Sequence, residues 1–210
     1  MKFTYESYKG MIELLRTNGY EFVGYHDYER DGKCVILRHD IDNSIEKAVA
    51  LAEIEKALGV RSTYFVLLTT DFYNVASVKS LEGLHRIADL GHEIGLHFDE
   101  MAYLEDKRDD VPGLIKREAD ILGQILGMDI RSVSMHRPSK ETLAADYKIP
   151  GIVNSYGQTF FHEFKYLSDS RRRWREPVLD IIALGGAQRL HILTHAIWYN
   201  YQEETIAETR

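Results

Sequence analysis

Asp40 and Asp42 are two carboxylates whose spacing could support catalysis, because they lie two residues apart after an apolar run, Cys34–Leu37. That run is typical of a buried strand. In an extended segment, side chains two positions apart point the same way, so both carboxylates can face one site while His39 faces the other side. Two close carboxylates repel each other unless a cation compensates, and a metal on one would leave the other as a general base. The spacing is equally compatible with one aspartate capping a helix and the other lying in solvent.

Three histidines, His97, His136 and His195, each stand at the end of a later segment that we predict to be a strand. His92 lies five residues before His97, on the opposite strand face, so we do not expect these two to share a metal. One aspartate with His97 and His136 would leave a fourth position open for water, which is the pattern of a catalytic zinc site. His195 is placed to donate a proton.

These side chains come together only if the strands run parallel in one sheet. Strand-like segments alternate with helical segments, which is typical of βαβ units, and active sites of such folds lie at the carboxyl ends of the strands. About seven strands would close a barrel better than they would fill an open sheet. We therefore predict an α/β fold with an irregular (β/α) barrel of parallel strands, with a doubly wound sheet as the alternative. The predicted strands are Cys34–Arg38, Ser62–Leu68, Glu93–His97, Ile130–Met135, Gly151–Ser155, Lys165–Ser168 and Leu190–Thr194.

The composition favours one compact catalytic domain over residues 1–210, because the sequence has no linker, repeat or low-complexity segment. The formal net charge of −7 argues against a nucleic-acid backbone as partner, since phosphate binding needs a basic face. The run Arg171–Arg175 is the exception, as either a solvated face or a contact for an anionic substrate group. Cys34 is the single cysteine, so no internal disulfide forms, and we expect it in the core.

The hydropathy pattern indicates neither an export signal nor a membrane span. About the first thirty residues are mixed polar and aromatic, without the apolar core of a signal peptide. No stretch approaches the roughly 18 apolar residues that cross a bilayer. We therefore expect a cytoplasmic protein with no membrane span; the sequence leaves the oligomeric state open.

Four segments together resemble the motifs of the polysaccharide deacetylases (NodB-homology, carbohydrate esterase family 4), as a divergent subgroup. They occur in the order of the family motifs and together span residues 34–198, most of the chain. The resemblance implies a deformed (β/α) barrel that removes acyl groups from amino sugars with a bound divalent metal. The segments are Arg38–Asp42, Gly91–His97, His136–Ser139 and Leu193–His195.

The motif resemblance implies a role for each matching residue. Asp40 corresponds to the family's catalytic base and Asp42 to its metal-binding aspartate. His97 corresponds to the histidine ligand of the second motif. Arg137 corresponds to the arginine that holds the base, and His195 to the histidine acid.

A degenerate fourth motif is similar to the segment Tyr166–Arg175. Its aspartate, Asp169, would orient the histidine acid, and its tryptophan, Trp174, would line the substrate pocket. Trp198 is a further aromatic residue that could stack on a sugar near the same rim. These matches predict a carbohydrate or amino-sugar substrate.

The second motif departs from the family at one position. The family has a further histidine four residues after the first, where this sequence has Met101. Another side chain must then supply the third metal ligand. We expect His136 to do so, with Asp99 as the alternative.

We hypothesise that Asp42, His97 and His136 hold zinc, that Asp40 takes a proton from water and that His195 protonates the leaving amine. Such a pair of groups predicts a bell-shaped pH profile. A second hypothesis is another C–N hydrolase that acts on a formyl amide or a small cyclic amide, which would need a closed pocket rather than an open groove. A third is a non-catalytic, sugar-binding relative.

Overall fold

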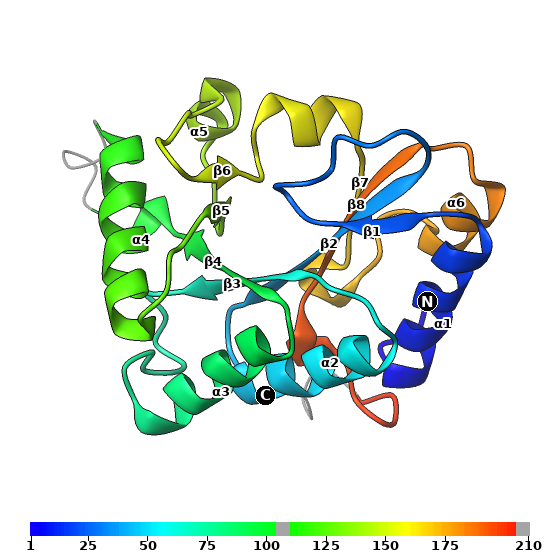
Figure 1. Ribbon diagram of the computed structural model, residues 1–210, viewed down its shortest axis with the longest axis horizontal. Helices are drawn as coiled ribbons and strands as arrows, with labels where there is room; N and C mark the ends of the chain where they lie inside the picture. Colours follow the sequence, from blue (N-terminus) through cyan, green and yellow to red (C-terminus); the bar gives the residue numbers. More distant parts are fainter. Residues whose placement is uncertain (104–109, 205–210) are drawn as a thin grey trace.

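A sheet of parallel strands forms the centre of the computed structural model, which describes residues 1–103 and 110–204 (Figure 1). Seven of the strands in this part of the chain follow one another in the order β6-β5-β4-β3-β2-β8-β7. β1 pairs with the first residues of β2, whereas β3 pairs with its last residues. The strands are β1 (Glu21–Val23), β2 (Cys34–Ile41), β3 (Thr63–Leu67), β4 (Glu93–Phe98), β5 (Ser132–Met135), β6 (Val153–Asn154), β7 (Lys165–Ser168) and β8 (Arg189–Thr194).

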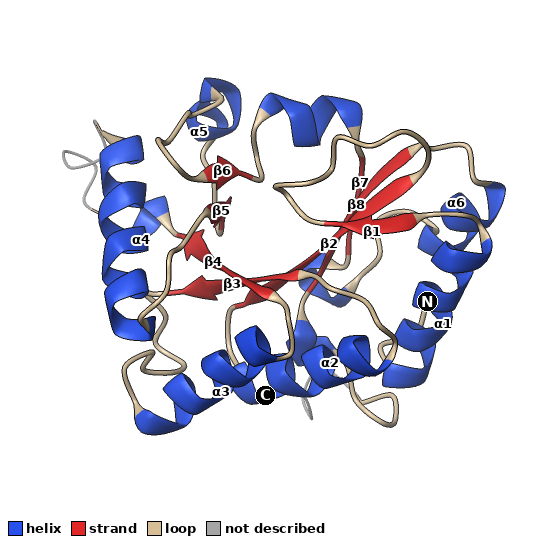
Figure 2. Cartoon of the chain, viewed as in Figure 1, coloured by secondary structure: helices blue, strands red, loops and turns tan. Residues whose placement is uncertain are grey.

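The sheet curls into a half-barrel, and its long helices lie along the outer side (Figure 2). The predicted irregular (β/α) barrel is thereby confirmed. The doubly wound alternative is wrong, because that arrangement would place helices on both faces of the sheet. The helices are α1 (Tyr5–Thr17), α2 (Ile45–Ala57), α3 (Val78–Asp89), α4 (Val111–Leu126), α5 (Lys140–Ala145) and α6 (Val178–Leu184).

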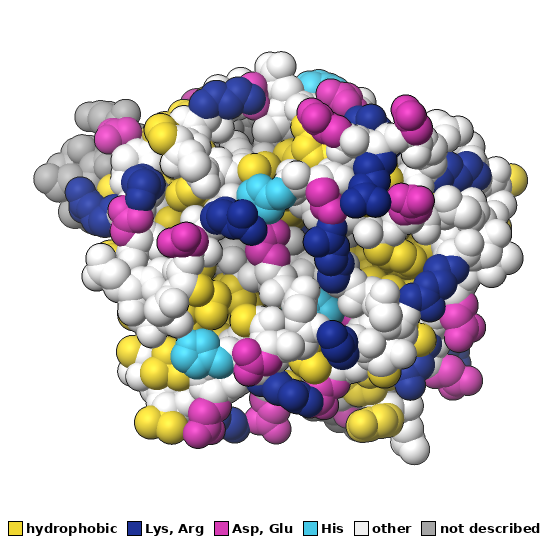
Figure 3. Space-filling model, viewed as in Figure 1, with side chains coloured by type: hydrophobic (Ala, Val, Ile, Leu, Met, Phe, Trp, Pro, Cys, Tyr) yellow, Lys and Arg dark blue, Asp and Glu magenta, His cyan; other side chains and the backbone are white. Residues whose placement is uncertain are grey.

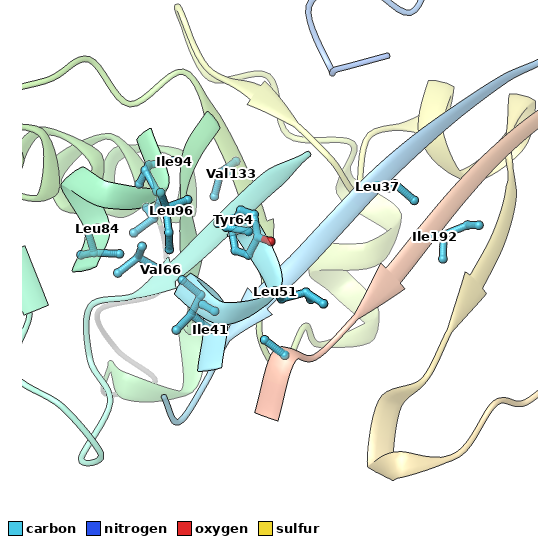
Figure 4. Packing of buried hydrophobic residues seen from close by; sticks show 14 of the residues in the cluster. Leu37, Ile41, Leu51, Tyr64, Val66, Leu84, Ile94, Leu96, Val133 and Ile192 are labelled. Carbon is cyan, nitrogen blue, oxygen red and sulfur yellow. The ribbon is translucent and has the colours of Figure 1, made fainter. Parts of the chain in front are cut away.

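β2 is buried along its whole length because it has packed layers on both sides. Leu37 and Ile41 join the large core cluster between sheet and helices, together with Leu51 of α2 (Figure 4). Cys34, as expected, is buried, and with Ile36 it belongs to a second cluster on the other face of the strand. The alternation of two faces therefore divides β2 between two hydrophobic clusters.

Side-chain caps fix where the helices that follow the site strands begin. Ser44 accepts a hydrogen bond from the Lys47 amide at the start of α2, and Ser77 caps α3 in the same way. Such caps satisfy amides that have no partner within the helix. Gly127 ends α4 in the left-handed conformation. Helix α1 and strand β1 lie before the first element that the sequence predicts.

Exposed charges contribute little to this fold. Figure 3 shows acidic and basic side chains interspersed over one face of the molecule. Solvent screens exposed ion pairs such as Arg86 with Glu53, so they stabilise a fold only weakly. Among the described residues, no helix has the length and apolar character needed to cross a membrane.

A buried carboxylate, Glu55 of α2, ties α1 and the sheet to α2. Its Oε1 accepts hydrogen bonds from Tyr8 of α1 at 2.6 Å and interacts with His39 of β2 at 2.9 Å. Its Oε2 accepts hydrogen bonds from Ser62 at 2.6 Å and Tyr64 at 2.7 Å. Burial opposes the charge, but the attraction and hydrogen bond of His39, the attraction of His92 and the hydrogen bond from Ser62 outweigh it and lower the pKa of Glu55 to about 2.

Replacing Glu55 by glutamine is expected to lower the free energy of unfolding at neutral pH. The shift from an ordinary pKa of 4.5 to about 2 corresponds to about 3 kcal/mol. Because the pKa in the folded protein is depressed, this stabilisation is complete above about pH 4.5 and is lost as the pH falls toward 2. Urea unfolding at several pH values measures the effect.

The matched control is Glu53→Gln, because Glu53 lies on the same helix but is half-exposed. Its free energy of unfolding should stay within about 0.5 kcal/mol of the wild type. A Glu55→Gln deficit that did not narrow between pH 4.5 and 2.5 would contradict the assigned charge state of Glu55.

Candidate active site

The carboxyl ends of four strands bring the sequence-predicted residues to one place. Asp42 follows β2, His97 lies in β4, and His136 and His195 follow β5 and β8. The strands are all parallel, so these ends share one edge of the sheet. Side chains that are far apart in the sequence thereby meet around Asp42.

Asp42, His97 and His136 form the centre of the site. Asp42 Oδ1 lies 3.3 Å from His97 Nε2 and 3.3 Å from His136 Nδ1, and the two nitrogens are 3.1 Å apart. Burial opposes the charge of Asp42, but contacts with His136 and His97 outweigh it and hold its pKa well below the ordinary value. The three ligand-type atoms therefore converge on one point.

The residues present fit a divalent metal. Asp42 Oδ1 is buried and makes no hydrogen bond within the described residues, which is costly for a carboxylate oxygen unless a cation compensates. In a tetrahedral site with bonds of about 2.0–2.1 Å, neighbouring ligand atoms lie about 3.3 Å apart. The separations of the three atoms agree with that value, and their chemistry suits zinc.

His97 is held by its other ring nitrogen. Nδ1 lies 2.6 Å from Oγ of the buried Ser134, on the neighbouring strand β5. A proton on Nδ1, shared with this hydroxyl, would leave Nε2 free to bind a metal. Ser134 is a site residue that the sequence analysis missed.

The third-ligand position differs from the family pattern, as the sequence indicates. Met101 lies partly exposed in the turn Glu100–Ala102. Asp99, the alternative ligand, points elsewhere: it accepts a hydrogen bond from the Met101 amide and binds Arg137. His136 is the residue that the structure brings to Asp42 and His97.

Asp40 lies beside this centre, on the same side of the sheet. Its Oδ2 is 3.5 Å from His97 Nε2, and its side chain is almost fully buried. Arg38 donates from Nε to Oδ1 at 2.9 Å and from a terminal nitrogen to Oδ2 at 2.8 Å. Burial opposes the charge, but the attraction of Arg38 outweighs it and lowers the pKa of Asp40. Asp40 is therefore ionised at neutral pH.

Arg137 does not make the contact that the motif resemblance implies. Its guanidinium is more than half exposed and lies on Asp99, with Nε 3.2 Å from Oδ2. The rim position after β5 directs Arg137 outward, whereas Arg38 reaches Asp40 from within the same strand. The i, i+2 relation that places Asp40 and Asp42 on one face applies equally to Arg38, so the signal was present in the sequence.

His195 and Asp169 form a buried pair. His195 Nδ1 lies 2.7 Å from Asp169 Oδ1, and the His195 amide donates to the same oxygen at 3.1 Å. Tyr199 donates to Oδ2 at 3.2 Å, a contact that the sequence did not indicate. Burial disfavours the imidazolium, but Asp169 more than compensates and raises the pKa of His195 to about 9. Nε2 of this cationic ring lies 3.8 Å from Asp42 Oδ2.

Both predicted substrate-binding tryptophans, Trp174 and Trp198, pack against the large core cluster. The Trp198 ring also lies 6.2 Å from the His195 ring, centroid to centroid. Both indole N–H groups are buried and have no hydrogen-bond partner among the described residues. Trp198 thus adjoins the site. In the arginine run, the Arg172 guanidinium packs over the Phe3 ring at 5.7 Å, so this side chain contributes to the protein's own packing.

Comparison with known proteins supports the fold. No model of a known protein family matches the sequence, and no curated protein matches it. A solved structure, the CE4 domain of a multidomain xylanase from the hindgut metagenome of Trinervitermes trinervoides, has a TM-score of 0.51 at 16% identity, covering 85% of this chain and 78% of that one.

Two further structures are similar to the same extent. A peptidoglycan deacetylase from Bdellovibrio bacteriovorus gives a TM-score of 0.51 at 19% identity, covering 86% of this chain and 48% of that one. A CE4 family pseudoenzyme from Bacillus anthracis gives a TM-score of 0.51 at 17% identity, covering 79% of this chain and 56% of that one. The chain therefore has the fold of the family 4 carbohydrate esterases, as the motif resemblance implied. That fold is shared by deacetylases and by at least one pseudoenzyme, so activity must be argued from the site.

Proposed function

We propose that this protein is a metal-dependent deacetylase that removes an N-acyl group, such as acetyl, from an amino sugar or glycan. The observation that carries the proposal is the convergence of Asp42, His97 and His136 beside two further groups, Asp40 and His195. One of these two is an anion and the other a cation at neutral pH. Amide hydrolysis requires such a pair, one group to take a proton and one to give it.

Asp42, His97 and His136 are the residues that would hold the metal, and zinc is the metal that their ligand types suit. A bound zinc would supply Lewis acidity, lowering the pKa of water from about 15.7 toward about 7 and polarising the acyl carbonyl. Ser134 would keep the His97 ring in the binding orientation.

Asp40 and His195, which both lie beside that centre, would carry out the proton transfers. Asp40 accepts a proton from the attacking water as the water oxygen forms a bond to the acyl carbon. His195 donates its Nε2 proton to the leaving amine nitrogen, since its other nitrogen is engaged by Asp169. The C–N bond breaks as this proton arrives, and acetate and the free amine result. Trp198 adjoins His195 and is placed to contact the sugar that carries the amide.

The test combines metal content with acyl release. The protein is stripped with a chelator, reloaded with zinc and assayed for acetate release from N-acetylglucosamine oligosaccharides. We expect about one zinc per chain and activity that requires it. His136→Ala should lose both.

His26→Ala is the matched control, because His26 pairs with Glu93 at the opposite ends of the strands and should retain zinc and activity. Equal zinc content in the wild type and His136→Ala would overturn the site. Zinc binding with turnover of only N-formyl or cyclic amides would support another C–N hydrolase. Zinc and sugar binding without turnover would indicate a non-catalytic relative.

A further inference from the structure

We propose that Arg38, and not Arg137, is the residue that positions the catalytic base Asp40; this inference rests on the deacetylase function proposed above. The two arginines occupy different environments. Arg38 is fully buried within β2, whereas the Arg137 side chain is 59% exposed on the rim. Only the buried arginine reaches Asp40 among the described residues, and it does so through two hydrogen bonds.

The contact between Arg38 and Asp40 has the geometry of a fixed clamp. Nε donates to Oδ1 at 2.9 Å while a terminal nitrogen donates to Oδ2 at 2.8 Å, so both carboxylate oxygens are held by one planar group. Such paired bonds fix the plane of the carboxylate as well as its position. The same plane directs Oδ2 toward the metal-binding centre, where it lies 3.5 Å from His97 Nε2. Arg38 thereby sets the direction from which Asp40 can take a proton.

Two aromatic rings pack against the guanidinium. Its central carbon lies 5.3 Å from the centroid of the Phe65 ring and 4.9 Å from that of Tyr156. Ser155 Oγ accepts a further hydrogen bond at 3.4 Å. A lysine could not reproduce this arrangement, because an ammonium group has neither the flat faces nor the fork of a guanidinium.

A glycine in β4 makes room for this arrangement. Phe65 pairs in register with Gly95, and a Cβ at Gly95 would lie 2.5 Å from a Phe65 ring carbon and 2.6 Å from Ser132 Oγ. Any larger residue would force the Phe65 ring or Ser132 to shift, and Phe65 is one of the rings that pack on Arg38. The sequence Gly95-Leu96-His97 thus supplies a metal-binding histidine and, two residues earlier, the space that the clamp requires.

The pair of Arg38 and Asp40 is buried, so breaking it is costly in free energy. An unpaired carboxylate in this position would be costly, so Asp40 depends on Arg38 for its charge. The Arg137 guanidinium instead donates a hydrogen bond to Asp99, at the edge of the site. Loss of Arg137 should therefore leave the base in place, whereas loss of the Arg38 fork should displace it.

The first experiment needs no activity. In the zinc-loaded protein, the Nε–H of Arg38 should give an arginine side-chain NMR signal that exchanges slowly with solvent. We expect Asp40→Asn to shift this signal and speed its exchange, and Arg137→Ala to leave it unchanged. A signal that responded to Arg137→Ala, or not at all to Asp40→Asn, would overturn the clamp even in a protein without deacetylase activity.

The second experiment measures the consequence for catalysis. Arg38→Lys keeps the charge and should fold; we expect kcat to fall by about 10- to 100-fold, with KM within about threefold and zinc content unchanged. In Arg137→Ala, the factor by which kcat falls should be at least about ten times smaller than in Arg38→Lys. Gly95→Ala should reproduce the Arg38→Lys pattern, and Arg61→Lys, at the far end of β3, should match the wild type.

The outcomes separate the two proposals. Wild-type activity with an undiminished kcat in Arg38→Lys would overturn the positioning role while the deacetylase function stands. A larger loss of kcat in Arg137→Ala than in Arg38→Lys would show that Arg137 positions the base, as the motif resemblance implies. A wild type that binds zinc without releasing acetate would refute the proposed function, and the NMR experiment would still decide whether Arg38 clamps Asp40.

Discussion

Asp42→Ala is expected to abolish metal binding and to reduce acetate release by about a thousandfold or more, because Lewis-acid stabilisation of several kcal/mol is lost. Asp42 Oδ1 is the atom that lies 3.3 Å from both His97 Nε2 and His136 Nδ1. Without it, two imidazoles remain, and they lack the negative charge that balances a divalent cation. Zinc content after dialysis and the rate of acetate release are the two measurements.

Asp71→Ala is the matched control for this prediction. Asp71 is an exposed aspartate in the segment that follows β3, near the site in sequence but outside the centre. It should keep its zinc and its turnover. An Asp42→Ala protein that bound zinc as tightly as the wild type would show that the metal, if any, is held elsewhere.

Asp40→Asn is expected to separate catalysis from metal binding. General-base catalysis contributes about 10²- to 10⁴-fold, so kcat should fall by that factor while zinc content stays unchanged. An asparagine cannot take the proton, yet its shape leaves Asp42 and His97 undisturbed. A kcat within threefold of the wild type, or a loss of zinc together with activity, would contradict the division of roles between Asp40 and Asp42.

The same variant should also destabilise the fold, because it leaves the Arg38 guanidinium buried without its counter-charge. Breaking a buried pair in this way costs about 3–5 kcal/mol in the free energy of unfolding. A double variant, Arg38→Met with Asp40→Leu, removes both charges and should recover much of the stability but none of the activity. Urea unfolding of the single and double variants tests this, with Asp71→Asn as the control.

The sequence by itself determined the parallel sheet and the edge at which the site residues lie. The apolar run at Cys34–Leu37 predicts a buried strand, and the later alternation of strand-like and helical segments predicts a parallel sheet. Residues at the ends of parallel strands must share one edge, so Asp42, His97, His136 and His195 could be placed together before any contact was known. The prediction that these residues meet succeeds because strand periodicity is a property of the local sequence and parallel topology follows from the order of the connections.

The first residues of the chain were one part of the fold that local pattern left unassigned. Helix α1 is anchored by Tyr8, whose hydroxyl donates to Glu55 of α2. The benefit of that hydrogen bond depends on a partner 47 residues away. No local rule of spacing predicts such a pairing, because the partner's position is set by how α2 packs on the sheet.

Which arginine contacts Asp40 was likewise decided only by the tertiary structure. Motif order alone favours Arg137, but the rim position turns it outward to Asp99, and the space beside Gly95 admits the Phe65 ring that supports Arg38. The third candidate metal ligand was open in the sequence between His136 and Asp99, and in the structure it is His136 whose Nδ1 lies 3.3 Å from Asp42 Oδ1. Residue type and strand position thus determined which groups gather at the site, whereas side-chain packing across neighbouring strands decided which of them touch.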